Sequence, residues 1–158
     1  MSDDTHAAPE DRLRARRLAL DWLARREHSR RELQAKLVSK GCGETLAGEV
    51  LAELEAEHLL SDERFAEALV CVRRDRGYGP LHIQREMQDK GVDPELIERA
   101  VGASDPQWAE VINRVRRKKF GERLPKDYRE RAKQARFLQY RGFTYDQIQC
   151  VLNPTDLE

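Results

Sequence analysis

A helical pattern that occurs three times along the chain constrains its fold more than any other feature of the sequence. The segments DERFAEALVCVRRDRG (residues 62–77) and DPQWAEVINRVRRKKFG (residues 105–121) align along their length, with Phe65 opposite Trp108. Apolar residues three and four positions apart lie on one face of a helix, so each segment predicts a helix with one buried side. In residues 62–77 the predicted buried face carries Phe65, Ala68, Leu69 and Val72. The same spacing recurs near the start of the chain at Ala15, Leu18, Ala19 and Trp22.

Each repeat also contains a glycine that directly follows a basic residue. These pairs are Lys40-Gly41, Lys90-Gly91 and Arg141-Gly142. Glycine readily adopts the left-handed conformation that ends a helix, and a preceding cation complements the carbonyl end of the helix dipole. Apolar residues lie four positions before and ten positions after every one of these glycines: Leu37, Met87, Leu138, Leu51, Val101 and Leu152. The constant offsets predict a second and a third helix in each repeat.

We therefore predict an all-α fold of nine helices in three tandem three-helix repeats, stacked into an elongated, curved array. Ser29 with Glu32 and Thr144 with Gln147 are predicted capping boxes at two helix starts. An insertion around residues 121–126 predicts a loop in the third repeat. The predicted ranges are a disordered tail at 1–10, repeats at 11–59, 60–103 and 104–153, and a C-terminal tail at 154–158.

The charged residues are balanced in number but not in position. Lys+Arg and Asp+Glu number 29 each, so the net charge is zero, which argues against a surface devoted wholly to nucleic acid. Residues 12–31 and 114–141 are strongly basic, whereas residues 44–67 carry eight acids against one arginine. Solvated helix faces explain any one of these blocks. The three blocks together suggest separate basic and acidic surfaces.

The sequence offers no pattern for an enzyme, a metal site or a membrane span. It has no P-loop, GxGxxG, HExxH or GxSxG segment, and its four histidines lie in separate segments. The three cysteines, Cys42, Cys71 and Cys150, form no CxxC pair. No apolar run approaches the roughly 18 residues of a membrane helix. We expect a cytoplasmic protein that is not an enzyme and that holds no catalytic residue, metal or cofactor.

The candidate binding residues are the cations that recur after the same apolar face, together with one tyrosine. In the first repeat they are Arg26, Arg30 and Arg31. In the second they are Arg73, Arg74, Arg76, Tyr78, Arg85 and Lys90, and in the third Arg116, Arg117, Lys118 and Lys119. Each arginine is also explained as a solvated side chain, and Tyr78 as a ring packed over a helix junction. The functional alternative is an aromatic group among cations that stacks on a base or fits a partner's groove.

Two segments resemble the RecX family of bacterial regulatory proteins. They are LLSDERFAEALVCVRRDRGYGPLHIQREMQDKGVD and YRERAKQARFLQYRGFTYDQIQCVL, and the likeness extends over about residues 12–153. DERFAEA, GYGP and RFLxxRGF at these distances form a specific combination. The matching positions in the second repeat are Asp62, Glu63, Arg64, Phe65, Tyr78, Gly79 and Pro80. The first repeat matches the family pattern least.

The resemblance implies a regulator that binds RecA and RecA–single-stranded DNA filaments. Such a protein inhibits the recombinase, ATPase and co-protease activities of RecA, and so modulates homologous recombination, DNA repair and the SOS response. The resemblance also implies tandem three-helix repeats and no cofactor. We expect a monomer with weak direct DNA binding. The alternative is a stand-alone DNA-binding helical module, which would bind DNA tightly with a steep dependence on salt.

Overall fold

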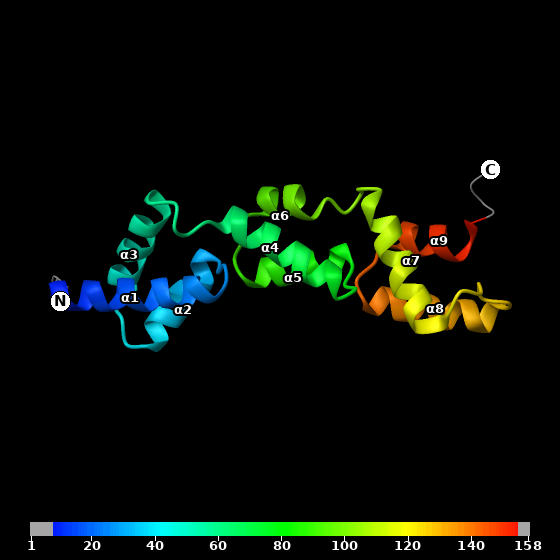
Figure 1. The fold of residues 1–158 in the computed structure, drawn as a ribbon, viewed down its shortest axis with the longest axis horizontal. Coiled ribbons are helices and arrows are strands. Elements are labelled where there is room, and N and C mark those ends of the chain that lie inside the picture. The colour runs from blue at the N-terminus through cyan, green and yellow to red at the C-terminus, as the bar shows by residue number, and fades with distance from the viewer. Residues whose placement is uncertain (1–7, 155–158) are drawn as a thin grey trace, which may run out of the picture. The chain divides into compact units, whose positions relative to one another are not determined.

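The structure, a computed structural model, describes residues 8–154 (Figure 1). Nine helices and no strand occur within this range, so the predicted all-α class is confirmed. Residues 1–7 and 155–158, to which the predicted tails were assigned in part, lie outside the described range. The described chain forms two compact units, one of residues 8–66 with 90–92 and one of residues 67–89 with 93–154.

The helices follow the predicted order of three per repeat. The first domain contains α1 (Pro9–Arg25), α2 (Arg30–Ser39) and α3 (Glu44–Ala56). The second contains α4 (Asp62–Asp75), α5 (Pro80–Asp89) and α6 (Pro94–Val101), and the third α7 (Gln107–Phe120), α8 (Tyr128–Tyr140) and α9 (Tyr145–Leu152). The insertion predicted around residues 121–126 is the connection between α7 and α8. Helix α1 begins at Pro9, two residues before the predicted start of the first repeat at residue 11.

The helix ends follow the sequence signals with one exception. Gly41, Gly91 and Gly142 all have positive φ, so each ends its helix as predicted. Thr144 and Gln147 form a complete capping box at the start of α9. At α2, the Ser29 side chain accepts a hydrogen bond from the backbone N–H of Glu32, but the Glu32 side chain pairs with Arg26. The predicted box at Ser29 is therefore wrong in its second half.

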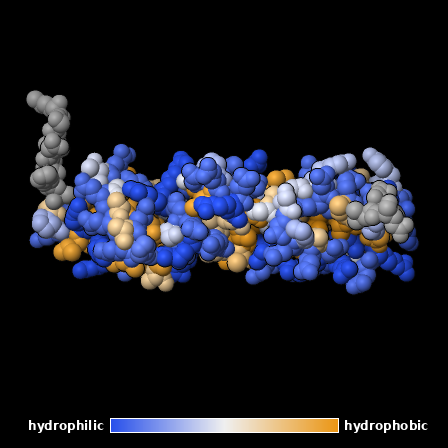
Figure 2. Space-filling model, turned by 90° about the horizontal axis from the view of Figure 1, so that it is seen from above, coloured by the Kyte–Doolittle hydropathy of each residue, from blue (hydrophilic) through white to orange (hydrophobic). Residues whose placement is uncertain are grey.

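The first domain has its own apolar core. Helix α3 packs against both α1 and α2. The core is formed by fully buried small and aliphatic side chains: Ala15, Ala19, Leu33, Leu37, Ala47, Val50, Leu51 and Leu54. Leu18 and Trp22 of α1 are partly buried against it. The buried alanines let α1 approach its neighbours closely. On the face of the molecule drawn in Figure 2, hydrophilic residues predominate.

In α7 the predicted apolar face is the buried one, whereas in α4 it is not. Trp108, Val111, Ile112 and Val115 are all buried in α7. In α4 the prediction is wrong at Val72, whose side chain is 46% exposed, while Ala66 and Val70 are buried with Phe65. Consecutive positions lie about 100° apart around a helix, so burying Ala66 and Val70 turns Val72 outward.

Candidate functional site

Three arginines of the first domain are neutralised by its own acidic segment, residues 44–57. Side chains of α1 and α2 pair with glutamates on or directly after α3: Arg12 with Glu49 and Glu53, Arg16 with Glu57, and Arg30 with Glu55. The prediction of separate basic and acidic surfaces is therefore wrong for this domain. The basic and acidic blocks of the sequence fold onto one another, which leaves less uncompensated charge for a partner.

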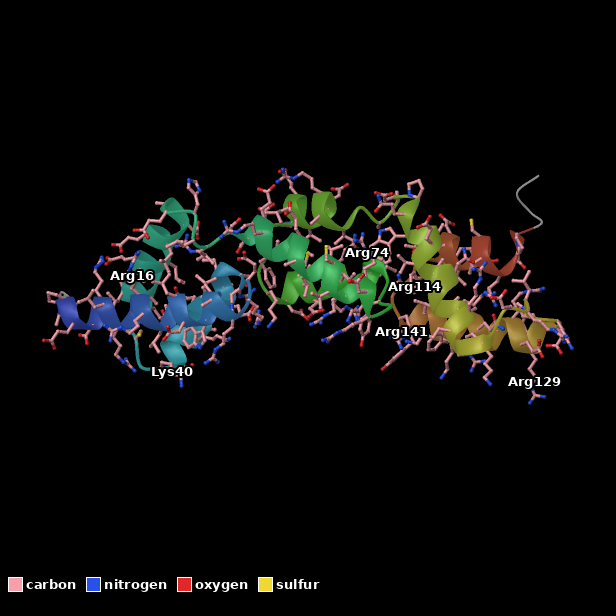
Figure 3. The ribbon with its side chains drawn as sticks, in the orientation of Figure 1. Arg16, Lys40, Arg74, Arg114, Arg129 and Arg141 are labelled. Carbon is pink, nitrogen blue, oxygen red and sulfur yellow. The ribbon has the colours of Figure 1, made fainter. Side chains whose placement is uncertain are left out.

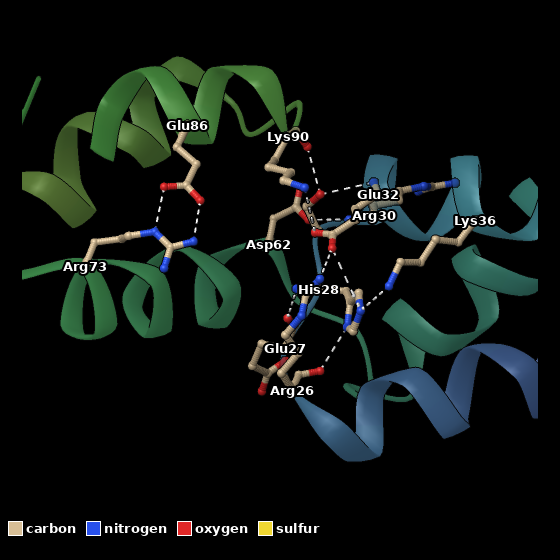
Figure 4. A network of polar contacts seen from close by, with 11 residues as sticks. Arg26, Glu27, His28, Arg30, Glu32, Lys36, Asp62, Arg73, Glu86 and Lys90 are labelled. Carbon is tan, nitrogen blue, oxygen red and sulfur yellow. Dashed lines mark hydrogen bonds and ion pairs between the residues drawn. The ribbon is translucent and has the colours of Figure 1, made fainter. Parts of the chain in front are cut away.

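Four of the predicted binding residues lie where the start of α2 meets residues 90–92. Arg26 pairs with Glu32, and the Nζ of Lys90 lies 3.9 Å from the same carboxylate (Figure 4). The stem of Arg31 covers Gly91 so closely that a Cβ built there would fall 2.9 Å from the Arg31 Cβ. Arg30 is the fourth, and its backbone N–H donates to Asp62. We call the contacts of residues 29–31 with residues 90–91 the first joint.

Polar side chains hold the first joint together. The Ser29 hydroxyl is fully buried and donates to the carbonyl oxygen of Lys90 over 2.8 Å. Burial raises the pKa of Glu32, but the Arg26 hydrogen bond and the charges of Arg26 and Lys90 outweigh this, so that its pKa is lowered. Glu32 is therefore a carboxylate at neutral pH, and both cations depend on it for their pairing.

Next to this joint lies a buried, neutral histidine. The Nδ1 of His28 is 3.0 Å from the Arg26 carbonyl oxygen, and its Nε2 is 3.0 Å from the Lys36 Nζ. An ammonium group can only donate, so Nε2 accepts and Nδ1 carries the proton. Burial lowers the pKa of His28, with the nearby charge of Arg26 acting in the same direction. Burial also lowers the pKa of Lys36.

The hydrogen bonds of the equivalent contact in the other compact unit are made by backbone groups alone. The N–H of Gly79 donates to the carbonyl oxygen of Arg141, and the N–H of Leu81 to that of Gly142, both over 2.8 Å. A Cβ on Gly79 would lie 2.5 Å from the backbone of Gly142 and Phe143, so only glycine permits this approach. We call the contacts of residues 79–82 with residues 141–143 the second joint.

Side chains beside the second joint form a row of alternating rings and cations. The rings of Tyr78 and His82 are stacked with centroids 4.3 Å apart. The guanidinium of Arg141 lies 5.1 Å from the Tyr78 centroid and 5.4 Å from that of Phe137. The Nζ of Lys119 lies 5.5 Å from the Phe137 centroid. We call these five residues the aromatic–cation row, whose cations are held over ring faces.

A depression of about 390 Å³ adjoins the row. It is lined by Arg73, Arg76, Tyr78, His82, Arg85, Glu86 and Asp89. Arg73 makes two hydrogen bonds to the Glu86 carboxylate, of 2.8 and 2.7 Å, and this contact raises the pKa of Arg73. Arg76 and Arg85 are exposed. The depression therefore offers two unengaged guanidinium groups next to an aromatic ring, which suits an anionic or amide-rich partner surface.

The remaining predicted binding residues, Arg74 and Arg116 to Lys118, differ in how far their side chains are exposed. Arg116 is only 2% exposed and donates to the carbonyl oxygens of Gly121, Glu122 and Arg123, so it fixes the loop after α7. The prediction of Arg116 as a partner-binding residue is therefore wrong, because its guanidinium is buried in this loop. Arg117 and Lys118 are exposed, and Arg74 is half-buried. The carbonyl oxygen of Arg74 accepts a hydrogen bond from Arg114, and both residues are labelled in Figure 3.

Sequence reasoning missed Arg141 and Phe137, which connect Tyr78 to Lys119. Both belong to the segment RFLQYRGF, so a signal was present. That segment was interpreted through its glycine and its family likeness, and not as a source of contact residues. The reason is distance along the chain, because residues 78 and 141 meet only through the packing of the second domain on the third within one compact unit.

The described residues contain no group of three or more His, Cys, Asp or Glu side chains placed to hold a metal ion. Cys42 is buried, and Cys71 and Cys150 are exposed free thiols. Between residues 8 and 154, no helix has the length and apolar character required to cross a membrane.

Comparison with known proteins gives a consistent result. Family models described as the first, second and third three-helix domains of RecX match residues 15–54, 61–101 and 105–152. A protein named "Regulatory protein RecX" from Pseudomonas entomophila is 41% identical over 142 residues, covering 90% of this chain and 92% of the relative. One of the same name from Pseudomonas syringae pv. tomato is 43% identical over 138 residues, with 87% and 89% covered.

A solved structure supports the fold. The crystal structure of RecX from Lactobacillus salivarius superposes with a TM-score of 0.80 at 24% sequence identity, covering 96% of this chain and all of that one. The tandem three-helix arrangement is thus shared with a crystal structure despite low identity.

Proposed function

Because the chain belongs to the RecX family of regulatory proteins, we propose that it binds RecA and RecA–single-stranded DNA filaments and inhibits them. The inhibited activities are strand exchange, ATP hydrolysis and co-protease activity. Through them the protein moderates homologous recombination, DNA repair and the SOS response in the cytoplasm. It acts as a monomeric binding protein and not as an enzyme.

The observation that carries this proposal is the aromatic–cation row with its adjoining depression. It brings Tyr78 and the exposed cations Arg76 and Arg85 together on the second domain, with Arg141 and Lys119 supplied by the third. Tyrosine and arginine dominate binding energy in protein interfaces, because each buries a large area and still makes polar contacts. At the first joint, by contrast, Arg26, Arg30 and Lys90 are paired with glutamates, which leaves Arg31 as the exposed cation without an ion pair among the described residues.

The test is the rate of RecA ATP hydrolysis on single-stranded DNA, measured with and without this protein. We expect wild-type protein at stoichiometric amounts to lower the rate. Tyr78→Ala combined with Arg76→Gln and Arg85→Gln is expected to abolish most of this inhibition. An unchanged rate with the wild-type protein would contradict the proposed function.

A control variant that removes three positive charges elsewhere, against two in the Tyr78 triple variant, separates the effect of this surface from that of net charge. Arg17, Arg25 and Lys40 are exposed cations of the first domain for which no side-chain ion pair occurs among the described residues. The variant Arg17→Gln, Arg25→Gln, Lys40→Gln removes three positive charges away from the row. We expect it to inhibit RecA as the wild type does. Full inhibition by the Tyr78 triple variant would reject our choice of surface.

A further inference from the structure

Helix α8 carries a stripe of cations that neither the row nor the depression uses. Arg129, Lys133, Arg136 and Tyr140 follow one another at intervals of four, three and four residues. This spacing places all four on one face of the helix. At a rise of about 1.5 Å per residue, the stripe extends over roughly 16 Å. We call these four residues the α8 stripe.

The stripe is free of internal partners. All four side chains are exposed, and Tyr140 is 85% exposed. No ion pair, side-chain hydrogen bond or ring contact engages any of them among the described residues, and Figure 3 shows Arg129 extending away from the ribbon. The opposite side of α8 carries the buried residues Gln134 and Leu138. The stripe thus contributes nothing visible to the fold.

Little negative charge offsets it. The only acids between residues 127 and 141 are Asp127 and Glu130. Asp127 caps α8 by accepting from the Glu130 N–H, and Glu130 accepts from the backbone N–H of Lys126 over 2.8 Å. Both carboxylates are therefore committed to the start of the helix. This differs from Arg12 and Arg16 of α1, which are paired with glutamates.

We propose that the α8 stripe binds single-stranded nucleic acid, with its three cations on phosphates and the Tyr140 ring stacked on a base. Cations that track a backbone, followed by an exposed aromatic ring, are the elements by which proteins hold single strands. In a double helix the bases are stacked on one another, so no base face would be exposed for the Tyr140 ring to stack on. A protein surface could also engage an exposed tyrosine and cations, and the RecA readout of the test below distinguishes that alternative.

The stripe is distinct from the surface assigned to RecA, so it is tested without RecA. The probe is a fluorescein-labelled 20-nucleotide oligo(dT), and the readout is fluorescence anisotropy at several salt concentrations. Neutralising Arg129, Lys133 and Arg136 to glutamine is expected to flatten the slope of log affinity against log salt by about 2, since each phosphate contact on a single strand contributes about 0.7. Tyr140→Ala is expected to weaken binding about tenfold with little change in slope.

The control is the variant Arg17→Gln, Arg25→Gln, Lys40→Gln, which makes the same change in net charge elsewhere. We expect it to keep the wild-type slope, and circular dichroism melting to be the same for all variants because the altered side chains are exposed. Equal loss of binding in both triple variants would overturn the proposal, as would wild-type protein that does not bind oligo(dT). Unchanged oligo(dT) binding by the stripe variant, with RecA inhibition lost, would assign the stripe to the protein partner instead.

Discussion

The two joints are built at equivalent places in the repeat but by different chemistry. In the first, the Ser29 hydroxyl donates to the carbonyl oxygen of Lys90 and is surrounded by charged side chains. In the second, the backbone N–H of Gly79 donates to the carbonyl oxygen of Arg141 without any side chain. Where side chains make the contact, their polar groups are already paired within the protein. Where the backbone makes it, the guanidinium groups of Arg76 and Arg85 beside it have no ion pair among the described residues.

This difference explains which predicted residues can serve a partner. Arg26 and Arg30 are occupied by Glu32 and Glu55, and Lys90 lies near Glu32, all within the first domain and its joint. Beside the second joint, Arg141 and Tyr78 belong to the aromatic–cation row. We infer that the first joint is structural and that the second presents the binding surface.

The largest expected effect is that of Gly79→Ala. The added Cβ would lie 2.5 Å from the backbone of Gly142 and Phe143, which cannot move without breaking the second joint. We expect the free energy of unfolding to fall by about 3 kcal/mol. Urea unfolding followed by the fluorescence of Trp108, in a Trp22→Phe background, measures this.

Gly48→Ala is the matched control for that variant. Gly48 lies within α3, where a Cβ would find its nearest neighbour 3.9 Å away. Alanine favours a helix over glycine by up to about 1 kcal/mol, so this change is expected to stabilise the protein. A similar loss of stability in both variants would show that the second joint has no special need for glycine.

A smaller loss is expected from Ser29→Ala in the first joint. The change removes the α2 cap and leaves the carbonyl oxygen of Lys90 without its hydroxyl donor. Together these losses amount to about 2 kcal/mol. Thermal unfolding followed by Trp22 fluorescence, with Trp108 replaced by Phe, reports this unit. Ser29→Thr keeps a hydroxyl and is expected to recover part of the loss.

The smallest expected effect is a pH dependence confined to the first joint. Burial lowers the pKa of His28 below its usual value of 6.5, so the unfolded chain takes up a proton that the folded chain resists. Stability is therefore unaffected above about pH 7 and falls as the pH drops below 6.5. Urea unfolding at pH 7.5 and 5.5 measures the change.

His28→Gln provides the control, since it cannot titrate. Its stability is expected to vary less across the same interval. Glu32 does not interfere there, because its pKa is lowered from 4.5 and its protonation belongs to more acid solutions. The same pH dependence in wild type and variant would assign the effect to other groups. The first joint would then not differ from the second in its response to pH.

The fold could be predicted largely from the sequence, because its signals are local and repeated. The three glycines and the apolar residues at fixed offsets from them, such as Leu37, Met87 and Leu138, are all placed as expected. The face of α4 was predicted incorrectly, because the spacing of apolar residues could not distinguish Val72 from Val70. Packing against neighbouring helices decided between them.

The candidate site could be predicted only in part. Tyr78, Arg76 and Arg85 were identified as an aromatic group among cations. Which cations are neutralised depends on contacts between distant segments, as in Arg30 with Glu55. The burial of Arg116 was hidden for the same reason, since four consecutive cations in a sequence do not reveal which one turns inward.

The most direct test of our central claim is hydrogen–deuterium exchange of this protein with and without RecA filaments on single-stranded DNA. We predict that binding slows exchange in residues 73–89 and 137–142, which contain the depression and most of the aromatic–cation row. Residues 9–56 are expected to exchange as in the free protein. Protection confined to residues 9–56, or absent from both regions, would contradict the claim that the second joint presents the binding surface.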